Sequence, residues 1–546
     1  MSLVTGGQAV VDALVAEGVE IVFGIPGEHT IPLYDGLYHH RERLRHILPR
    51  HEQGAGFMAE GYAMASGRPG VCITTTGPGA FNALTALAEA YGDSMPVLMI
   101  TSEVGREFIG QARGITHESK DQLGVLQRAA GWAAQASTVG EIPKLIHEAF
   151  ARMRTGRPRP AVVQIPLDVL AERGEATPCP PAETHHEGAD PAAVEQAARL
   201  LAKARRPIVW AGGGVNIALA NEHLRQVAEL LGAPVITTPD GKGAIPEDHP
   251  LALGNSSGEG PVTALLREAD AALVVGTRFQ QRIMRNWTLP LPRNSVRIDV
   301  DPEEIPKNYP PAVGLAGDAR MVLEQLLGKL REQTVEPKPH VARELESIRE
   351  RINAYLSRHH QLEFEMVGIL RQELDREAIL FSDTARGVGW LRNLLPSYTP
   401  RSSWTPGGFS TLGFAVPAAI GAKAALPERQ VVAAVGDGSF MFTCAELGTA
   451  IQERLPVNIL LFNNCAHQLI KDHQDVECEG RHIAADLVQP DFVRFAECFG
   501  ALGLRVERLD QLAPALRQAR EAAVPSIVEI TLPVGRPVRT PEAESA

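Results

Sequence analysis

The chain has 546 residues, of which 44% are hydrophobic, a composition typical of globular proteins with several cores. Its 53 lysines and arginines are outnumbered by 65 aspartates and glutamates, and the net charge of −12 argues against a nucleic-acid partner. The six cysteines include no Cys-x-x-Cys pair, which argues against a zinc site or disulfide framework and indicates a reducing, cytoplasmic compartment. No stretch has the pattern of a secretory signal or a membrane span, so we expect no membrane partner.

Short apolar runs alternate with helical patterns along the whole chain, and two proline-rich stretches interrupt this rhythm as linkers. The pattern predicts α/β domains with doubly wound parallel sheets, namely an N-terminal domain (1–176), a central domain (190–335) and a C-terminal domain (342–533). The polar tail Gly535–Ala546 is expected to be loose. The expected strands are Ile21–Phe23, Val71–Ile73, Val97–Ile100, Ala161–Ile165, Pro207–Trp210, Pro234–Thr237, Ala272–Val275, Val296–Val300, Ile379–Phe381, Val431–Val435, Val457–Phe462 and Ile527–Leu532.

The segment Val431–Asn464 carries the strongest local signal in the sequence. The apolar runs Val431–Val435 and Val457–Phe462 are typical of buried strands, and a helical pattern lies between them. The two strands of such a strand–helix–strand unit must be parallel. Asp437 and Asn464 therefore leave their strands at the same carboxyl edge of the sheet, where ligands bind in such folds.

The residues at this edge suit a metal-chelated diphosphate. Gly436 and Gly438 allow the backbone to turn tightly and to approach a bulky anion, and the helix after Gly438 offers free N–H groups. Asp437 and Asn464 supply the hard oxygen ligands that Mg²⁺ prefers. Gly-Asp-Gly alone would also fit an ordinary βαβ unit with an aspartate in its turn, but the Asn463-Asn464 pair after the next strand favours the metal site.

The run Gly436-Asp-Gly-Ser, followed by a helix and by Asn463-Asn464, resembles the thiamine diphosphate (ThDP) fingerprint of the 2-oxo-acid decarboxylase and acetolactate synthase superfamily. The resemblance covers almost the whole chain and implies pyrimidine-binding, central and diphosphate-binding domains in that order. It implies ThDP and Mg²⁺ as cofactors, with the metal bound by Asp437, Asn464 and the backbone carbonyl of Ala466. The cofactor-binding residues that it implies are Glu52, Thr75, Gly77, Arg386, Leu412, Gly436, Asp437, Gly438, Ser439 and Asn464.

The N-terminal domain carries a second mark of this superfamily in His51-Glu52-Gln-Gly-Ala-Gly. In family members the carboxyl group at the matching position hydrogen-bonds N1′ of the aminopyrimidine, and the resulting imino form removes the C2 proton through N4′. The resemblance therefore makes Glu52 a catalytic residue. The alternative is a glutamate that only stabilises the dipole of its helix.

Four further residues match the family less specifically. The turn with Thr75 and Gly77 resembles one that lines the same cleft. Leu412 matches the bulky residue under the cofactor that enforces its bent conformation and brings N4′ up to C2, with an ordinary core leucine as the alternative. Arg386 follows an expected strand and matches by position only.

The resemblance also implies how the chains assemble. In this family different chains bind the two halves of one ThDP molecule. We therefore expect a homodimer, or a dimer of dimers, in which Glu52 of one subunit acts on the cofactor held by Asp437 and Asn464 of the other. The other expected partner is a small-molecule 2-oxo acid.

The central domain resembles that of acetolactate synthases, which bind FAD there. The resemblance rests on Arg206-Pro-Ile-Val-Trp-Ala-Gly-Gly-Gly, Val275-Gly-Thr-Arg-Phe and Ile298-Asp-Val-Asp-Pro. Because many nucleotide-free α/β domains also have a glycine-rich turn, FAD is an open prediction. Two departures from acetolactate synthases fall at positions that line the substrate pocket in the family, so the substrate and the outcome stay open: the loop around residue 117 differs, and His473 stands where those enzymes have a tryptophan.

The loop Arg113-Gly-Ile-Thr-His-Glu-Ser-Lys-Asp-Gln resembles that of 5-guanidino-2-oxopentanoate decarboxylases. A decarboxylase must protonate the enamine left after CO₂ departs, and a histidine suits that step near neutral pH. His117 is the first candidate and His467 and His473 follow, while a histidine that only bonds a neighbouring carbonyl is the alternative. Asp472 could receive a cationic substrate tail or belong to a solvated acidic loop. The expected substrate-pocket residues are Glu28, His29, His117, Gln122, Leu469 and Asp472.

Three classes of function stay open at this point. The first is non-oxidative decarboxylation of a 2-oxo acid through a C2 adduct and enamine, or carboligation as in acetolactate synthases. The second is a flavin-linked 2-oxo-acid oxidase, which a yellow colour of the purified protein would indicate. The third is a non-catalytic cofactor-binding subunit, against which the presence of Glu52, Asp437 and Asn464 argues.

Overall fold

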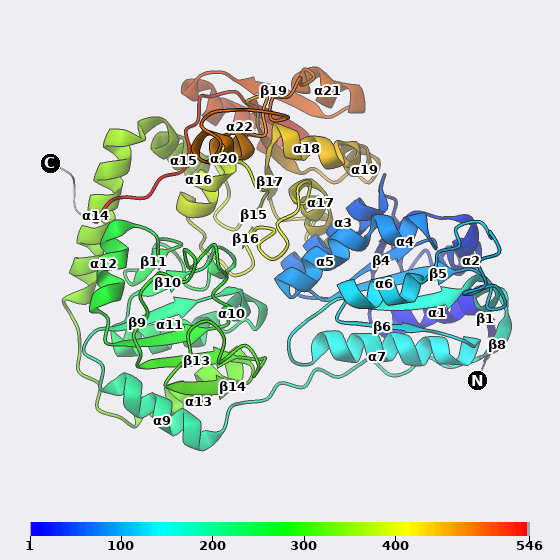
Figure 1. Cartoon of the computed structure of the whole chain (residues 1–546), viewed down its shortest axis with the longest axis horizontal. Helices are drawn as coiled ribbons and strands as arrows, with labels where there is room; N and C mark the ends of the chain where they lie inside the picture. The colour runs from blue at the N-terminus through cyan, green and yellow to red at the C-terminus, as the bar shows by residue number, and fades with distance from the viewer. Residues whose placement is uncertain (1, 543–546) are drawn as a thin grey trace.

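The computed structural model describes residues 2–542, which form three six-stranded parallel sheets with helices on both faces (Figure 1). Strands and helices alternate along the chain, as the sequence pattern predicts, and the doubly wound α/β fold class is confirmed. The strands of each six-stranded sheet fall inside one expected domain range, while the domain boundaries themselves stay a prediction. Within residues 2–542 no helix combines the length and apolarity needed to cross a bilayer.

The N-terminal sheet is formed by β2 Ile21–Gly24, β3 Arg45–Ile47, β4 Gly70–Thr74, β5 Val97–Glu103, β6 Trp132–Gln135 and β7 Ala161–Pro166. Its order is β3-β2-β4-β5-β7-β6, and a short antiparallel ribbon joins β1 Ser2–Thr5 to β8 Arg173–Ala176. The edge strands β3 and β6 are not predicted from the sequence because they lack a continuous buried apolar run. Its helices are α1 Gly6–Ala16, α2 Ile31–His39, α3 Glu52–Ser66, α4 Pro78–Asn82, α5 Leu84–Asp93, α6 Gln122–Ala129, α7 Ile142–Arg154 and α8 Leu167–Ala171.

The C-terminal sheet is formed by β15 Ile379–Ser382, β16 Ser403–Trp404, β17 Val431–Gly436, β18 Asn458–Phe462, β19 Leu502–Val506 and β20 Ser526–Ile530. Its order is β16-β15-β17-β18-β20-β19. Its helices are α14 Val341–His359, α15 Gln361–Glu373, α16 Arg386–Leu394, α17 Ala415–Ala425, α18 Asp437–Thr443, α19 Leu447–Gln452, α20 Gln468–Glu477, α21 Phe492–Phe499 and α22 Leu512–Glu521.

The N- and C-terminal sheets share one topology, because numbering the strands within each sheet gives the same spatial order. β2 thus corresponds to β15, β3 to β16, β4 to β17 and β5 to β18. In both sheets the order reverses between the first and third strands, which places a binding crevice at the carboxyl ends of β2 and β4 and of β15 and β17. The sequence alone did not reveal this internal repeat.

The central sheet is formed by β9 Pro207–Ala211, β10 Val235–Thr237, β11 Ala252–Gly254, β12 Ala271–Val275, β13 Ser295–Asp299 and β14 Val313–Ala316. Its order, β11-β10-β9-β12-β13-β14, is that of a dinucleotide-binding fold, with the crevice between β9 and β12. Its helices are α9 Pro191–Ala202, α10 Gly213–Ile217, α11 Asn221–Leu231, α12 Gly260–Glu268 and α13 Ala319–Arg331.

Helices α3 and α17 join the N- and C-terminal sheets at the centre of the molecule (Figure 1). A side chain on Gly61 would overlap the backbone of Ala418, and one on Gly421 would overlap the backbone of Met58. Glycine at both positions therefore lets the two helix backbones touch. Since α3 begins with Glu52, this contact fixes the catalytic candidate relative to the C-terminal sheet.

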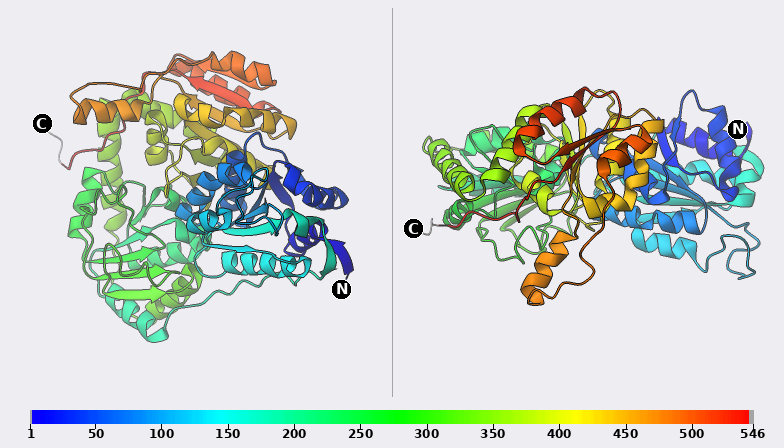
Figure 2. Two further views of the ribbon diagram at one scale, coloured as in Figure 1. Left: turned by 45° about the vertical axis from the view of Figure 1, so that its right-hand side comes forward. Right: turned by 90° about the horizontal axis from the view of Figure 1, so that it is seen from above.

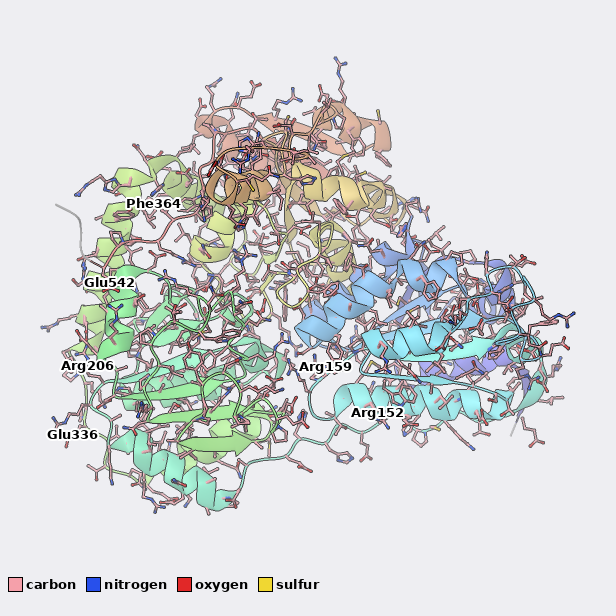
Figure 3. All side chains as sticks on the ribbon, in the orientation of Figure 1. Arg152, Arg159, Arg206, Glu336, Phe364 and Glu542 are labelled. Carbon is pink, nitrogen blue, oxygen red and sulfur yellow. The ribbon has the colours of Figure 1, made fainter. Side chains whose placement is uncertain are left out.

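The expectation of a loose tail is wrong for Gly535–Glu542, which lies against the central and C-terminal domains. Gly535 donates its N–H to Glu363 at 2.6 Å and accepts the Trp390 indole N–H at 2.9 Å. Arg351 donates to the carbonyl of Glu542 at 3.0 Å. Glu542 is labelled in Figure 3 at the end of the described chain. Glu363 and Trp390 are buried in the C-terminal domain, and Glu259, buried in the central domain, accepts the Thr540 N–H at 2.6 Å. These bonds compensate the ordering of a polar segment. Residues 543–546 lie outside the described part of the chain.

Candidate active site

The Gly-Asp-Gly turn joins β17 to α18 and needs its glycines for space. Gly436 has φ −82°, which any residue can adopt, so glycine is required here by the space available and not by the backbone angle. A Cβ on Gly436 would lie 2.7 Å from that of Ala385, and one on Gly438 would lie 2.7 Å from the His467 ring. The turn is therefore closely packed from both sides.

Asp437 and Asn464 lie next to each other, as the βαβ geometry predicts. Burial raises the pKa of the Asp437 carboxyl, while hydrogen bonds from the Gln489 amide and from backbone N–H groups, including that of Asn464, oppose this shift. Gln489 Nε2 donates to Asp437 Oδ2 at 3.0 Å, and the Asn464 residue is exposed. A cation in this place would compensate a buried charge that only weak donors now face.

These residues fit a magnesium ion better than a zinc ion. No group of three His, Cys, Asp or Glu side chains that could hold a metal occurs within residues 2–542. Asp437, Asn464 and the carbonyl of Ala466 offer three hard oxygens, and Mg²⁺ commonly completes such a set with water and phosphate oxygens. The ligand set therefore stays the prediction made from the sequence, and the surroundings of Asp437 support it.

The hydroxyl of Ser439 forms hydrogen bonds with other residues of the chain. It donates to Asp383 Oδ2 at 2.7 Å and accepts the N–H of Gly413 at 2.8 Å. Asp383 follows β15 on the other side of the crevice and is buried. Ser439 therefore has its backbone N–H, in the first turn of α18, as its free group toward an anion.

Arg386 and Asp472 form an ion pair with each other. The guanidinium of Arg386, in the first turn of α16, forms an ion pair with the Asp472 carboxylate on α20, to which Gln468 Nε2 also donates at 3.1 Å. The carboxylate is buried, although α20 itself stands out from the body as the orange helix in Figure 2. The charge of Asp472 is therefore already paired with a cation, and Arg386 uses Nε and Nη2 on this carboxylate.

The three remaining candidates near the C-terminal sheet lie in different surroundings. The ring of His467 packs against Gly438 in the cofactor turn. The His473 side chain is 60% exposed, and its Nδ1 lies 2.9 Å from Glu477, on the outer side of α20. Leu469 is half-buried. His467 thus contacts the cofactor turn. His473 would approach a substrate only if α20 moved or a second subunit covered it.

Glu52 is the first residue of α3 and is half-buried in the single chain. Its Oε2 accepts a hydrogen bond from Asn82 Nδ2 at 2.9 Å. The other carboxylate oxygen lies 3.4 Å from the place of a Cβ on Gly79, in the turn after β4. The carboxyl group is therefore held by the N-terminal domain, and its enclosure requires a further surface.

Glu446 is a site residue that the sequence reasoning missed. It lies between α18 and α19 in the turn Cys444–Glu446, is buried, and accepts the backbone N–H groups of Arg50 and His51 at 3.1 Å. It therefore reaches from the C-terminal domain to the backbone just before Glu52. A glutamate on the inner side of an otherwise apolar helical pattern is the signal that could have found it.

The turn after β4 is strained and closely covered. Gly77 has φ +64°, and a Cβ there would lie 3.1 Å from that of His117. The Gln122 amide bonds Gly77 N–H, the Thr76 hydroxyl, a backbone carbonyl and the Gln164 amide, at 2.6–2.9 Å. Gln122 thus positions this turn, and no donor or acceptor of its side chain is left for a substrate. The hydroxyl of Thr75 is buried and has no hydrogen-bond partner among the described residues.

His117 and His29 form a pair over this turn. Their ring centroids are 5.3 Å apart, and the Nδ1 atoms of both are buried without a partner among the described residues. His117 has φ +67°, a strained value for a residue with a side chain. Burial and the nearby His117 lower the pKa of His29, while the exposed Glu28 opposes this shift. The sequence candidates Glu28, His29 and His117 therefore meet at one place.

Leu412 is half-buried and follows a loop that leads into α17. The N–H of Gly413, the next residue, donates to Asp383 and Ser439, and its carbonyl accepts the Thr443 hydroxyl at 2.8 Å. The backbone at Leu412 is thereby tied to the turn that carries Asp437. The role of Leu412 under the cofactor stays a prediction.

A cavity of about 740 Å³ opens at the crevice of the central sheet. The glycine-rich turn after β9 contributes Gly213 and Gly214, the turn after β12 contributes Gly276, and Asp299 ends β13. A glycine turn between a strand and the start of a helix is the element that holds a diphosphate in dinucleotide-binding folds. Asp299 lies at the same edge of the sheet. The cavity therefore fits a nucleotide.

Comparison with known proteins assigns the class. Models of the thiamine pyrophosphate enzyme match the chain with the N-terminal TPP binding domain over residues 4–125, the central domain over 194–326 and the C-terminal TPP binding domain over 383–530. The chain belongs to this family and is an enzyme. Its cofactor is ThDP, which family members normally bind with a divalent metal such as Mg²⁺.

Individual relatives agree over nearly the full length. A probable 2-ketoarginine decarboxylase, AruI of Pseudomonas aeruginosa, is 37% identical over 96% of this chain and 94% of its own. A probable acetolactate synthase large subunit of Methanococcus aeolicus is 33% identical over 96% of this chain and 92% of its own. The acetolactate synthase large subunit IlvB1 of Mycobacterium tuberculosis is 36% identical over 94% of this chain and 86% of its own. The chain is thus of the decarboxylase and acetolactate synthase type.

Proposed function

We propose that this enzyme decarboxylates a 2-oxo acid without oxidation, and that the substrate carries a cationic guanidino tail. The observation that carries the proposal is the His29–His117 pair beside Glu28. His117 lies in the loop whose sequence differs from that of acetolactate synthases. The similarity to a probable 2-ketoarginine decarboxylase supports the same substrate class.

The cofactor would be held by the C-terminal turn of one subunit and activated by the N-terminal domain of the other, as in the family pattern. Asp437, Asn464 and the carbonyl of Ala466 bind the metal, and the first turn of α18 receives the diphosphate. When bound, ThDP supplies the carbon nucleophile for the 2-oxo group and takes up the electrons released with CO₂. Glu52 holds a proton at N1′ of the aminopyrimidine, and Leu412 supports the bent cofactor.

The histidine pair acts on the substrate side. His117, the more accessible ring, delivers a proton to the carbon from which CO₂ has left. His29 is buried, and its lowered pKa favours the neutral ring, which can hold His117 and steer the substrate carboxylate without adding a second charge.

The guanidino tail needs an acidic partner, and Glu28 fits best. Asp472 is paired with Arg386, whereas Glu28 is exposed beside the histidine pair and accepts no side-chain hydrogen bond among the described residues. A carboxylate binds a guanidinium through two parallel hydrogen bonds. Glu28 is therefore the proposed determinant of specificity.

A second candidate function is carboligation or flavin-linked oxidation, and the central cavity is the observation that favours a bound nucleotide. Its glycine turn and Asp299 suit the adenosine diphosphate part of FAD. In a non-oxidative enzyme the same cavity would hold a nucleotide with a structural role. The colour of the purified protein and its need for an electron acceptor separate the two cases.

A panel of 2-oxo acids tests the proposal. The purified enzyme, given ThDP and Mg²⁺, is assayed for CO₂, aldehyde and acetolactate with 5-guanidino-2-oxopentanoate, pyruvate and the neutral 2-oxohexanoate. We expect equal amounts of CO₂ and aldehyde, with the guanidino acid as the best substrate. Glu28→Gln should raise KM for the guanidino acid by about tenfold or more and leave the neutral acid unchanged. Acetolactate as the main product, or a strict need for an electron acceptor, would contradict it.

A further inference from the structure

The loop Thr405–Thr411, which leads to Leu412, is held by the N-terminal domain of the same chain. The carboxylate of Glu89 on α5 accepts the N–H groups of Phe409 and Thr411 at 2.9 Å and that of Ser410 at 3.3 Å. The Thr411 hydroxyl donates to the same carboxylate at 2.9 Å. Glu89 thus receives four hydrogen bonds from three consecutive residues that lie far from it in the sequence.

The rest of α5 supports this contact. Asp93, one helical turn after Glu89, accepts the N–H of Gly408 at 2.6 Å. A Cβ on Gly92 would lie 2.9 Å from Cα of Gly408, so the two backbones touch. Glu89 is fully buried, and a buried carboxylate that accepts this many hydrogen bonds fixes its donors more firmly than an exposed one.

Glu89 has a counterpart in the repeated topology of the two outer sheets. Glu446 lies between β17 and β18 and binds the backbone just before α3, which carries Glu52. Glu89 lies between β4 and β5, the matching connection, and binds the backbone just before α17, the matching helix. Each domain therefore uses one buried glutamate to hold the other domain's turn.

The two glutamates hold the backbone beside Glu52 and beside Leu412, which in the proposed dimer act on two different cofactor molecules, Glu52 on the one held by the partner subunit and Leu412 on the one held by its own chain. Glu446 accepts the N–H of the residue before Glu52, and Glu89 accepts the N–H of the residue before Leu412. On the far side of Leu412, the Gly413 N–H is held by Asp383 and Ser439. The backbone at Leu412 is therefore fixed by both neighbours, one tied to each domain.

We propose that Glu89 is a positioning residue that fixes Leu412 for the cofactor from the N-terminal domain of the same chain. The inference rests on the proposed role of Leu412 in bending ThDP. A carboxylate can accept all four bonds, whereas an amide has one acceptor oxygen and would turn two N–H donors toward backbone N–H groups. Glu89→Gln should therefore displace the loop without emptying the cofactor site.

The experiment measures ThDP affinity and proton–deuterium exchange at C2 of bound ThDP in the holoenzyme. For Glu89→Gln we expect ThDP affinity within about threefold of wild type and C2 exchange slower by about 10- to 100-fold, the usual effect of a displacement near 1 Å. Glu89→Asp, which keeps the charge, should recover part of the rate. Thr411→Val removes one of the four bonds and should slow exchange less.

Glu259→Gln is the matched control. Glu259 is buried and accepts the Thr540 N–H at 2.6 Å and an Arg539 hydrogen bond at 3.0 Å, and it lies in neither cofactor turn. This variant should lower thermal stability and leave C2 exchange unchanged. A decrease in exchange as large as that of Glu89→Gln would mean that loss of any buried carboxylate has this effect, and would overturn the proposal.

The proposal fails if folded Glu89→Gln exchanges C2 within about twofold of the wild-type rate. If Glu89→Gln does not fold, Thr411→Val decides, and a wild-type rate in that variant overturns the proposal. Leu412→Ala distinguishes the role of Leu412 under the cofactor from the positioning role of Glu89. If Leu412→Ala exchanges normally, the role of Leu412 is wrong; if it exchanges slowly while Glu89→Gln does not, only the positioning role is wrong.

Discussion

At the scale of single residues, two opposed effects act on the pKa of the Asp437 carboxyl, which burial raises and donated hydrogen bonds lower. Its neighbourhood with Asn464 follows from the parallel strands that precede them, and the structure brings the two together. The opposed effects on its pKa, burial against donated hydrogen bonds, depend on Gln489, which lies 52 residues further along. No local pattern predicts such a partner, because its position is set by the folding of an intervening loop.

His117 is predicted to act after the cofactor is activated. His117→Ala should keep ThDP affinity and C2 exchange, because it lies on the substrate side, and should lower turnover by roughly 10²–10⁴, the usual contribution of one positioned acid–base group. Steady-state rates with the best 2-oxo acid, measured beside C2 exchange, check this. Turnover within about threefold of wild type would make His117 a structural residue and turn attention to His467.

His29 makes stability fall toward acidic pH. Burial and the neighbouring His117 lower its pKa below the ordinary 6.5 in the folded chain, although Glu28 opposes this. As the pH falls below about 6.5, the unfolded chain takes up a proton that the folded chain refuses, so the free energy of unfolding decreases. Thermal unfolding from about pH 8 to pH 5 should therefore show a weaker pH dependence in His29→Gln than in wild type.

His39 provides the control for this measurement, because it is exposed on α2 in the same domain. His39→Gln should follow the wild-type pH dependence. Equal slopes in wild type and His29→Gln would show that His29 does not couple protonation to stability.

At the scale of elements, buried strands are the part of the fold that sequence predicts well. All twelve expected strands exist, because parallel strands covered on both faces leave continuous apolar runs. Edge strands such as β3 and β6 lack that signal. The expected helix after Gly438 is broken at Thr443, where φ is −136°, and a short turn places Glu446 under α3. Apolar periodicity continues through this break, so the pattern alone does not reveal it.

Glu446 is predicted to stabilise the start of α3. Glu446→Ala removes the acceptor for the Arg50 and His51 N–H groups and should lower the free energy of unfolding by about 1–3 kcal/mol. The melting temperature should fall. The rate of C2 exchange should fall as well, because Glu52 directly follows His51. The exposed Glu428 is the control, and its replacement by alanine should cost less than about 0.5 kcal/mol. Equal stability of both variants would contradict the role.

At the scale of the whole molecule, contacts between segments far apart in the sequence fix the turns of the site, and no local sequence pattern predicts them. Glu446 and Arg50 are 396 residues apart, and Glu89 and Phe409 are 320 apart. The N- and C-terminal sheets repeat one topology, and the pairing of the two glutamates follows from contacts between the two domains that the folded chain makes. The sequence could predict the cofactor turn and Glu52, but not the residues that hold them in place.

Mixing two inactive variants tests whether the active site lies between subunits. Asp437→Ala cannot hold the metal and Glu52→Gln cannot activate the cofactor, so each variant alone should be inactive. In a mixed dimer, one of the two sites combines intact Glu52 with intact Asp437, so an equal mixture should recover about one quarter of wild-type activity. The activity is measured after the mixed subunits are dissociated and reassembled. No recovery, with mixed dimers verified by tagged subunits, would place both residues in one chain's site.

C2 exchange in Glu52→Gln tests the central claim most directly, because it measures cofactor activation without a known substrate. ThDP and Mg²⁺ are bound to wild type and variant, and proton–deuterium exchange at C2 is followed over time. The account predicts that the variant binds ThDP but exchanges C2 at a rate near that of free ThDP, since an amide cannot supply the shared proton at N1′. Exchange at the wild-type rate in fully loaded Glu52→Gln would contradict it.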